Sequence, residues 1–134
     1  MQANGVTAGI AVQAQSRAEE TDQLLTWASV NPSVCGVVGW VDLTLPDIDS
    51  ALAKWLEHPK LKGFRHILQD ERDVGAFIAQ PAFYRGLRQL QAHQLTYDVL
   101  VFEHQMPDAV TLCARHDRHW LVLDHLGKPN LRTS

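Results

Sequence analysis

The stretch VCGVVGWVDL, residues 34–43, is apolar along almost its whole length. Its length and its weak alternation predict a β-strand that is buried on both faces, as in a parallel sheet covered by helices. Four similar runs flank it: AGIAVQAQ (8–15), LKGFRHIL (61–68), LTYDVLVF (95–102) and HWLVLDHL (119–126). The sequence therefore predicts five strands.

Segments of helical periodicity separate these runs. Ser16 and Glu19 form a capping-box pattern that predicts the start of the first helix, and Asp47 and Asp49 open the second. A strand every 24 to 34 residues is the rhythm of βα units, whose crossovers force parallel pairing. The predicted class is α/β. An open doubly wound sheet and five consecutive units of an eight-stranded barrel both fit this rhythm.

Composition restricts the function classes. The chain has 134 residues and a formal net charge of −3, which predicts one globular domain over residues 1–134 without the basic field that nucleic acid or an anionic membrane requires. The sequence has no apolar run of membrane-spanning length and no secretion signal at its start, so we expect a cytoplasmic location. Cys35 and Cys113 lie far apart and predict two buried, reduced thiols.

No glycine-rich phosphate-binding motif follows the first strand, which counts against a nucleotide site. Ligands of parallel α/β folds gather at the carboxyl ends of the strands, and in this sequence those ends are unusually polar. The residues that close the runs there include Gln13, Gln15, Trp40, Asp42, Arg65, His66, Phe102, Glu103, His104, Asp124, His125 and Lys128. This pattern predicts a ligand cleft at the carboxyl edge.

Arg65 could bind a carboxylate or a lactone carbonyl, because its guanidinium presents a planar set of donors. The structural alternative is a salt bridge to Asp42 or Asp70. His125 has the chemistry of a metal ligand, a general acid or base, or an oxyanion donor, and the alternative is a local hydrogen bond. His66 follows Arg65 directly, so the two point to opposite faces of their strand.

Other polar and aromatic residues have simpler interpretations. His116 and His119 lie near the amino end of the last strand, where we expect solvated surface. Asp98 falls within a strand and, if it faces the interior, requires a hydrogen bond or a cation on a neighbouring strand. Helical spacing places Trp27, Trp55, Phe83 and Leu87 in the core.

Four segments taken together resemble the amidohydrolase-related family of sugar and pyrone-dicarboxylate lactonases: VVGWVDL (37–43), HPKLKGFRH (58–66), LTYD (95–98) and LDHLGKP (123–129). The resemblance implies a TIM-type (β/α)₈ barrel that hydrolyses a small-molecule lactone. It implies that Arg65 holds the carboxylate or carbonyl of the substrate. His125 would polarise the reacting carbonyl, or bind a divalent metal ion in members that use one. Gln13, Trp40 and His66 match as pocket lining.

The chain departs from this family in two places. Members begin with a strand that carries a His-x-His pair and finish with a strand that carries the aspartate that activates water, and this sequence has neither. It therefore resembles the second to sixth strands, five of eight. We expect a fragment that is inactive by itself and self-associates through exposed sheet edges. The alternative is a truncated non-catalytic protein or a small-molecule-binding α/β module.

Overall fold

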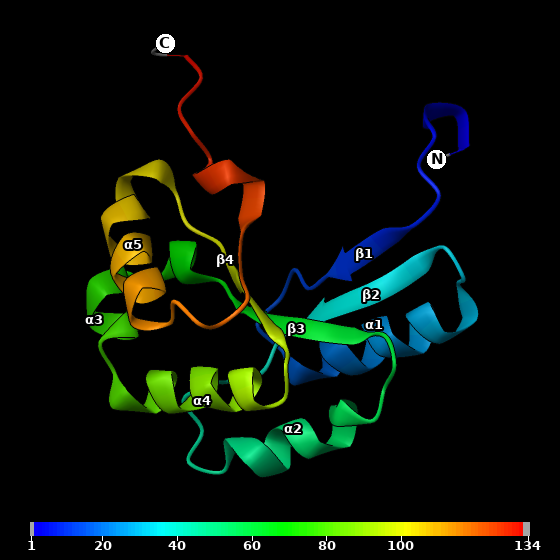
Figure 1. Ribbon diagram of the computed structural model, residues 1–134, viewed down its shortest axis with the longest axis horizontal. Coiled ribbons are helices and arrows are strands. Elements are labelled where there is room, and N and C mark those ends of the chain that lie inside the picture. The colour runs from blue at the N-terminus through cyan, green and yellow to red at the C-terminus, as the bar shows by residue number, and fades with distance from the viewer. Residues whose placement is uncertain (1, 133–134) are drawn as a thin grey trace.

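The computed structural model describes residues 2–132, which form five parallel strands with helices between them (Figure 1). The strands are β1 (Gly9–Val12), β2 (Val34–Gly39), β3 (Leu61–His66), β4 (Thr96–Val99) and β5 (Leu121–Leu123). Their spatial order is β1-β2-β3-β4-β5, identical to their order along the chain.

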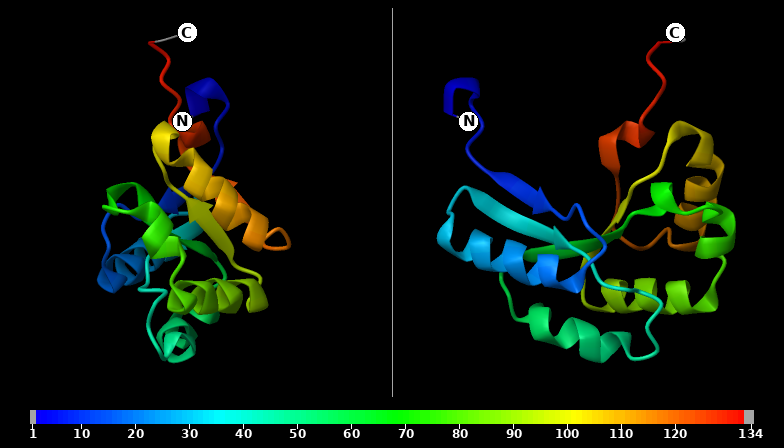
Figure 2. Two further views of the ribbon diagram at one scale, coloured as in Figure 1. Left: turned by 90° about the vertical axis from the view of Figure 1, so that its left-hand side faces the viewer. Right: turned by 180° about the vertical axis from the view of Figure 1, so that it is seen from behind.

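This strand order decides between the two architectures. A doubly wound sheet reverses direction at a switch point, whereas successive barrel strands always add to the same side. The order here never reverses, and the sheet curls as part of a cylinder (Figure 2). The prediction of a partial TIM-type barrel with five strands is confirmed.

Helices fill the crossovers, and no helix among residues 2–132 is long and apolar enough to cross a membrane. The α-helices are α1 (Ala18–Val30), α2 (Ile48–Leu56), α3 (Val74–Ile78), α4 (Pro81–Ala92) and α5 (Met106–Arg115). Short 3-10 turns are η1 (Gln2–Asn4), η2 (Leu68–Asp70), η3 (Glu103–Gln105) and η4 (Asp124–Gly127).

The pairing register separates the two faces of the sheet. Phe64 pairs with Gly39 and Tyr97, and a Cβ on Gly39 would touch Thr21 of α1, so this face is covered by helices. Arg65 pairs with Asp98, which pairs with Val122, so these three residues share the opposite, concave face.

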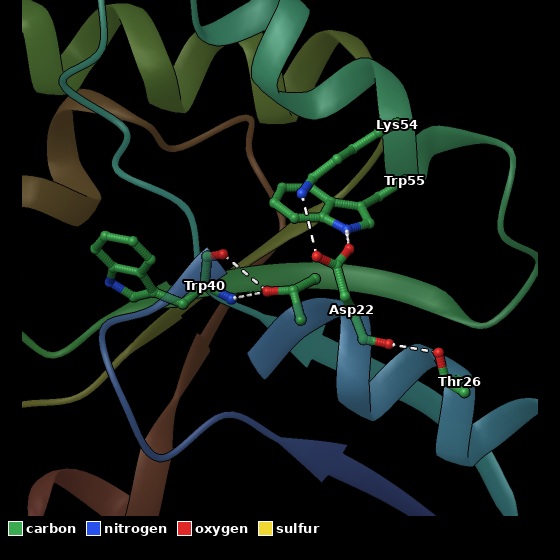
Figure 3. A network of polar contacts seen from close by, with 6 residues as sticks. Asp22, Thr26, Trp40, Lys54 and Trp55 are labelled. Carbon is green, nitrogen blue, oxygen red and sulfur yellow. Dashed lines mark hydrogen bonds and ion pairs between the residues drawn. The ribbon is translucent and has the colours of Figure 1, made fainter. Parts of the chain in front are cut away.

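Side-chain hydrogen bonds end the second strand earlier than predicted. The Thr21 hydroxyl donates to the Trp40 carbonyl and accepts from the Trp40 amide, both at 2.8 Å (Figure 3). These bonds replace ladder pairing, so β2 ends at Gly39 rather than at residue 43. In the same region, the Asp22 carboxylate accepts from the Trp55 indole at 2.6 Å and pairs with Lys54, which joins α1 to α2.

The predicted capping box of the first helix is wrong. The N-cap is Arg17, without a side-chain cap. Glu20 acts in place of Glu19: its carboxylate accepts the amides of Ala14 and Gln15, which satisfies backbone donors of the loop before α1.

Most of the predicted core is confirmed, since Trp55, Phe83 and Leu87 are all buried. Trp27 is 51% exposed, so its assignment to the core is wrong. Both cysteines are free, but Cys35 is exposed and Cys113 only half-buried, contrary to the prediction of two buried thiols.

One close approach in the core gives a test of the packing. A Cβ on Gly86 of α4 would lie 2.2 Å from the carbonyl oxygen of Leu43. Gly86→Ala would favour an isolated helix by up to about 1 kcal/mol. We expect it instead to lower the free energy of unfolding by about 1–3 kcal/mol, because the backbone of residue 43 must move. Urea unfolding followed by circular dichroism measures this change.

Gly9→Ala is the matched control, because a Cβ at Gly9 has no neighbouring heavy atom within 4 Å. An unchanged or higher urea midpoint for Gly86→Ala would show that α4 does not approach residue 43 this closely.

Candidate functional site

Three polar side chains from separate strands meet at the carboxyl edge of the sheet. The Arg65 guanidinium donates to Asp124 Oδ2 at 2.7 Å and to the backbone carbonyl of Gln13. The Gln13 side-chain amide donates back to the Arg65 carbonyl at 2.8 Å. Because Gln13 follows β1 and Asp124 follows β5, Arg65 connects the two outer strands across the concave side. We call Gln13, Arg65, Asp98 and Asp124 the carboxyl-edge cluster.

This arrangement corrects the expected salt bridge of Arg65. Its partner is Asp124, not Asp42 or Asp70, and the side chains of both partners are largely buried. Asp42 instead accepts from the amide and hydroxyl of Thr44 at 2.9 and 2.6 Å. Sequence distance hid the pair, because 59 residues separate Arg65 from Asp124.

Asp98 is the buried acid of the cluster. It lies opposite Arg65 in the register of β3 and β4, and it accepts a long hydrogen bond of 3.4 Å from the Thr96 hydroxyl. Burial and then the Asp124 carboxylate raise the pKa of Asp98 to about 6, while the Arg65 charge acts in the opposite direction. The predicted cation on a neighbouring strand is therefore Arg65.

Several polar atoms at this edge are buried without a partner among residues 2–132: Gln13 Oε1, Arg65 Nε and Trp40 Nε1. Buried donors and acceptors are nearly always paired in folded proteins. Trp40 directly follows β2, the strand between those of Gln13 and Arg65, so all three belong to the same edge. Together they are two N–H donors and one carbonyl acceptor that are buried without a partner in this part of the chain.

His66 lies away from this cluster. Its ring stacks on Phe77 with centroids 4.3 Å apart, and its Nε2 lies 2.7 Å from Glu71 Oε1. The alternation of side chains along β3 predicts this separation from Arg65. A pocket-lining role for His66 stays a prediction.

His125 follows Asp124 at the same edge and is exposed. It begins four consecutive residues with φ between 50° and 72°, His125 to Lys128, of which only Gly127 adopts such angles readily. The Lys128 ammonium donates to the side-chain carbonyl of Gln69, which ties this turn to the loop after β3. His125 therefore lies in a left-handed turn and does not continue the extended backbone of β5.

A metal role for His125 finds no companion ligands here. Within residues 2–132, no group of three His, Cys, Asp or Glu side chains could hold a metal ion. The described residues therefore do not form a complete metal site.

Comparison with known proteins identifies the family. A sequence model of the family described as Amidohydrolase matches residues 1–133. The chain belongs to the amidohydrolase family. It is 52% identical over 131 residues to an L-fucono-1,5-lactonase of Burkholderia multivorans, and the match covers 98% of this chain and 44% of that protein. An L-fucono-1,5-lactonase of Burkholderia ambifaria is 35% identical over 126 residues, which are 94% of this chain and 43% of that protein.

Solved structures show the same fold. A crystal structure of an amidohydrolase from Burkholderia multivorans with bound zinc superposes with a TM-score of 0.92 at 52% identity, covering 96% of this chain and 45% of that chain. Amidohydrolase 2 from Bifidobacterium longum subsp. infantis superposes with a TM-score of 0.68 at 19% identity, covering 93% of this chain and 46% of that chain. The chain thus spans less than half the length of these amidohydrolases.

The raised pKa of Asp98 predicts a pH-dependent stability. Between 3.8 and about 6 the folded chain binds more protons at Asp98 than the unfolded chain does. The contribution of this group to the free energy of unfolding therefore falls as the pH rises through that range, and is constant above it. Asp98→Asn removes this fall and raises the free energy of unfolding at pH 7 by about 1 kcal/mol.

Urea titrations at pH 4 to 8 measure the difference, and Asp117→Asn in the exposed turn after α5 is the matched control. Parallel pH profiles for the parent chain and Asp98→Asn would contradict the buried, raised-pKa carboxyl.

Proposed function

We propose that this chain supplies the carboxyl-edge cluster to a lactone-hydrolysing amidohydrolase barrel. Two relatives at 52% and 35% identity are L-fucono-1,5-lactonases, which supports a sugar lactone such as L-fucono-1,5-lactone as the substrate. In the reaction water adds to the ester carbonyl, the ring C–O bond breaks, and the alkoxide oxygen takes a proton to give an open hydroxy acid.

One observation carries the proposal: bonds to Asp124 and Gln13 fix the Arg65 guanidinium across the concave side, and its Nε–H has no partner among residues 2–132. A guanidinium has five N–H donors, so the bonds to Asp124 and Gln13 leave donors for a ligand. A preorganised donor of this kind binds a lactone carbonyl or carboxylate with little reorganisation. A pocket-lining role for Gln13, which is 0% exposed, stays a prediction.

We assign to His125 the role of polarising the reacting carbonyl group. His125 directly follows Asp124, the partner of Arg65, and is exposed to solvent. An imidazole N–H at this place stabilises the negative charge that develops on the carbonyl oxygen as water adds.

A small-molecule-binding module without catalysis is the second candidate, because binding requires only the cluster, whereas hydrolysis also requires a group that activates water. The cytoplasmic location, the absence of nucleic-acid partners and self-association through the edge strands β1 and β5 stay predictions.

The decisive experiment uses a chimera. The 131-residue matching segment of the Burkholderia multivorans lactonase is replaced by this chain, and hydrolysis of L-fucono-1,5-lactone is measured. We expect hydrolysis by the chimera, and in Arg65→Met a fall in kcat/KM of about 10²- to 10³-fold, because a fixed donor is lost. Arg65→Lys retains the charge but not the fork, so we expect a partial recovery.

Lys54→Met, on the helix-covered side of the same chimera, controls for the loss of a positive charge. A folded chimera that binds the hydroxy-acid product but does not hydrolyse the lactone would favour the binding module.

His125→Asn in the chimera tests the role of the imidazole. Asparagine tolerates the left-handed backbone of this position, so the turn is retained. We expect kcat to fall about 10²-fold or more with little change in KM. Leu126→Asn, at the next exposed position of the turn, is the matched control, and equal losses in both variants would show that only the turn matters.

A further inference from the structure

Two hollows adjoin along α4, and the smaller of them lies just before the amino ends of β4 and β5. Their volumes are about 500 and 410 Å³, and Gln91 lines both. The turn after α5 lies beside α4 and contributes the other wall (Figure 1). We call the two hollows together the amino-edge groove.

The larger hollow is lined by two arginines and two stacked rings. Arg115 donates to the Tyr84 hydroxyl at 3.1 Å and lies over the Tyr84 ring, 5.1 Å from its centroid. The His116 ring stacks on the Tyr84 ring, with the two centroids 4.9 Å apart. Arg88, one turn further along α4, completes this cationic wall.

The smaller hollow combines a third arginine with an exposed indole. Arg118 and His119 line it together with Trp120, which is 77% exposed. The flat face of the Trp120 indole suits stacking.

Two buried histidines correct the sequence prediction of solvated surface. His116 is 7% exposed and His119 8% exposed, because the turn after α5 folds them against α4 and β4. His119 Nε2 donates to the Leu95 carbonyl at 2.7 Å. His116 Nε2 and His119 Nδ1 have no partner in the described part of the chain, so each hollow is lined by a ring with an unsatisfied nitrogen.

The groove is electropositive. Within residues 2–132, none of Arg88, Arg115 and Arg118 forms an ion pair with a carboxylate. Asp117 is exposed and lines neither hollow. Burial lowers the pKa of His116, and His119 and the charges of Arg88 and Arg115 lower it further.

We propose that the amino-edge groove binds a small phosphorylated molecule that carries a flat ring. The arginines hold the phosphate, and Trp120 stacks on the ring. Three guanidinium groups without a carboxylate partner among residues 2–132 exceed what a singly charged carboxylate neutralises, whereas a phosphomonoester carries about 1.5 to 2 negative charges at neutral pH. The proposal is independent of lactone hydrolysis, because the groove shares no residue with the carboxyl-edge cluster.

Three compounds test the phosphate and the flat ring of the proposed ligand separately: AMP carries both groups, inorganic phosphate only the first and adenosine only the second. Calorimetric titration of the 134-residue chain should show saturable AMP binding that is tighter than phosphate binding, with adenosine the weakest. Arg88→Gln and Arg118→Gln should each weaken AMP binding about tenfold or more, as expected for a lost charge-assisted hydrogen bond. Trp120→Ala should reduce AMP affinity to that of phosphate.

Both arginines and Trp120 are exposed, so these substitutions leave the core intact, and circular dichroism confirms folding. Arg72→Gln, in the exposed loop before α3 at the other end of the sheet, is the matched control. The proposal is overturned if neither AMP nor phosphate binds, or if AMP binds equally to the arginine variants. Saturable binding of an acidic peptide without AMP binding would also overturn it and identify a protein interface.

Discussion

The ion pair between Arg65 and Asp124 is the contact on which the concave side depends. It joins β3 to the end of β5, while the bonds between Arg65 and Gln13 join β3 to the end of β1. Neither outer strand pairs with β3 through the backbone, so side chains alone connect them across this side. A largely buried guanidinium requires such partners, because leaving it unpaired would cost several kcal/mol.

The same contact determines the electrostatics of the candidate site. Arg65 faces two carboxyl groups, Asp98 and Asp124, and one arginine cannot fully compensate two buried negative charges. Burial, and then the Asp124 carboxylate, raise the pKa of Asp98, whereas Asp124 forms the ion pair. A ligand that meets Arg65 therefore enters a site in which the protonation of Asp98 is sensitive to further charge.

The two ends of the parallel strands present different chemistry. The carboxyl edge contains Arg65, acids, amides and His125, whereas Arg115 and Arg118 near the amino edge, and Arg88 within α4, pair with no carboxylate among residues 2–132. The separation follows from parallel topology, since all helix-to-strand turns lie at one edge and all strand-to-helix loops at the other.

The amino-acid pattern predicts the class, the five strands and the carboxyl-edge position of Gln13, Arg65 and His125, because apolar runs and helical periodicity are properties of local stretches. It also separated His66 from Arg65 through strand alternation. The packing of the folded chain establishes that Arg65 pairs with Asp124, that Thr21 bonds to the backbone of Trp40 and ends β2 at Gly39, that Trp27 is exposed, and that His116 and His119 are buried. Each of these depends on contacts between segments distant in the chain, whose proximity arises only when the sheet curls and the helices pack against it.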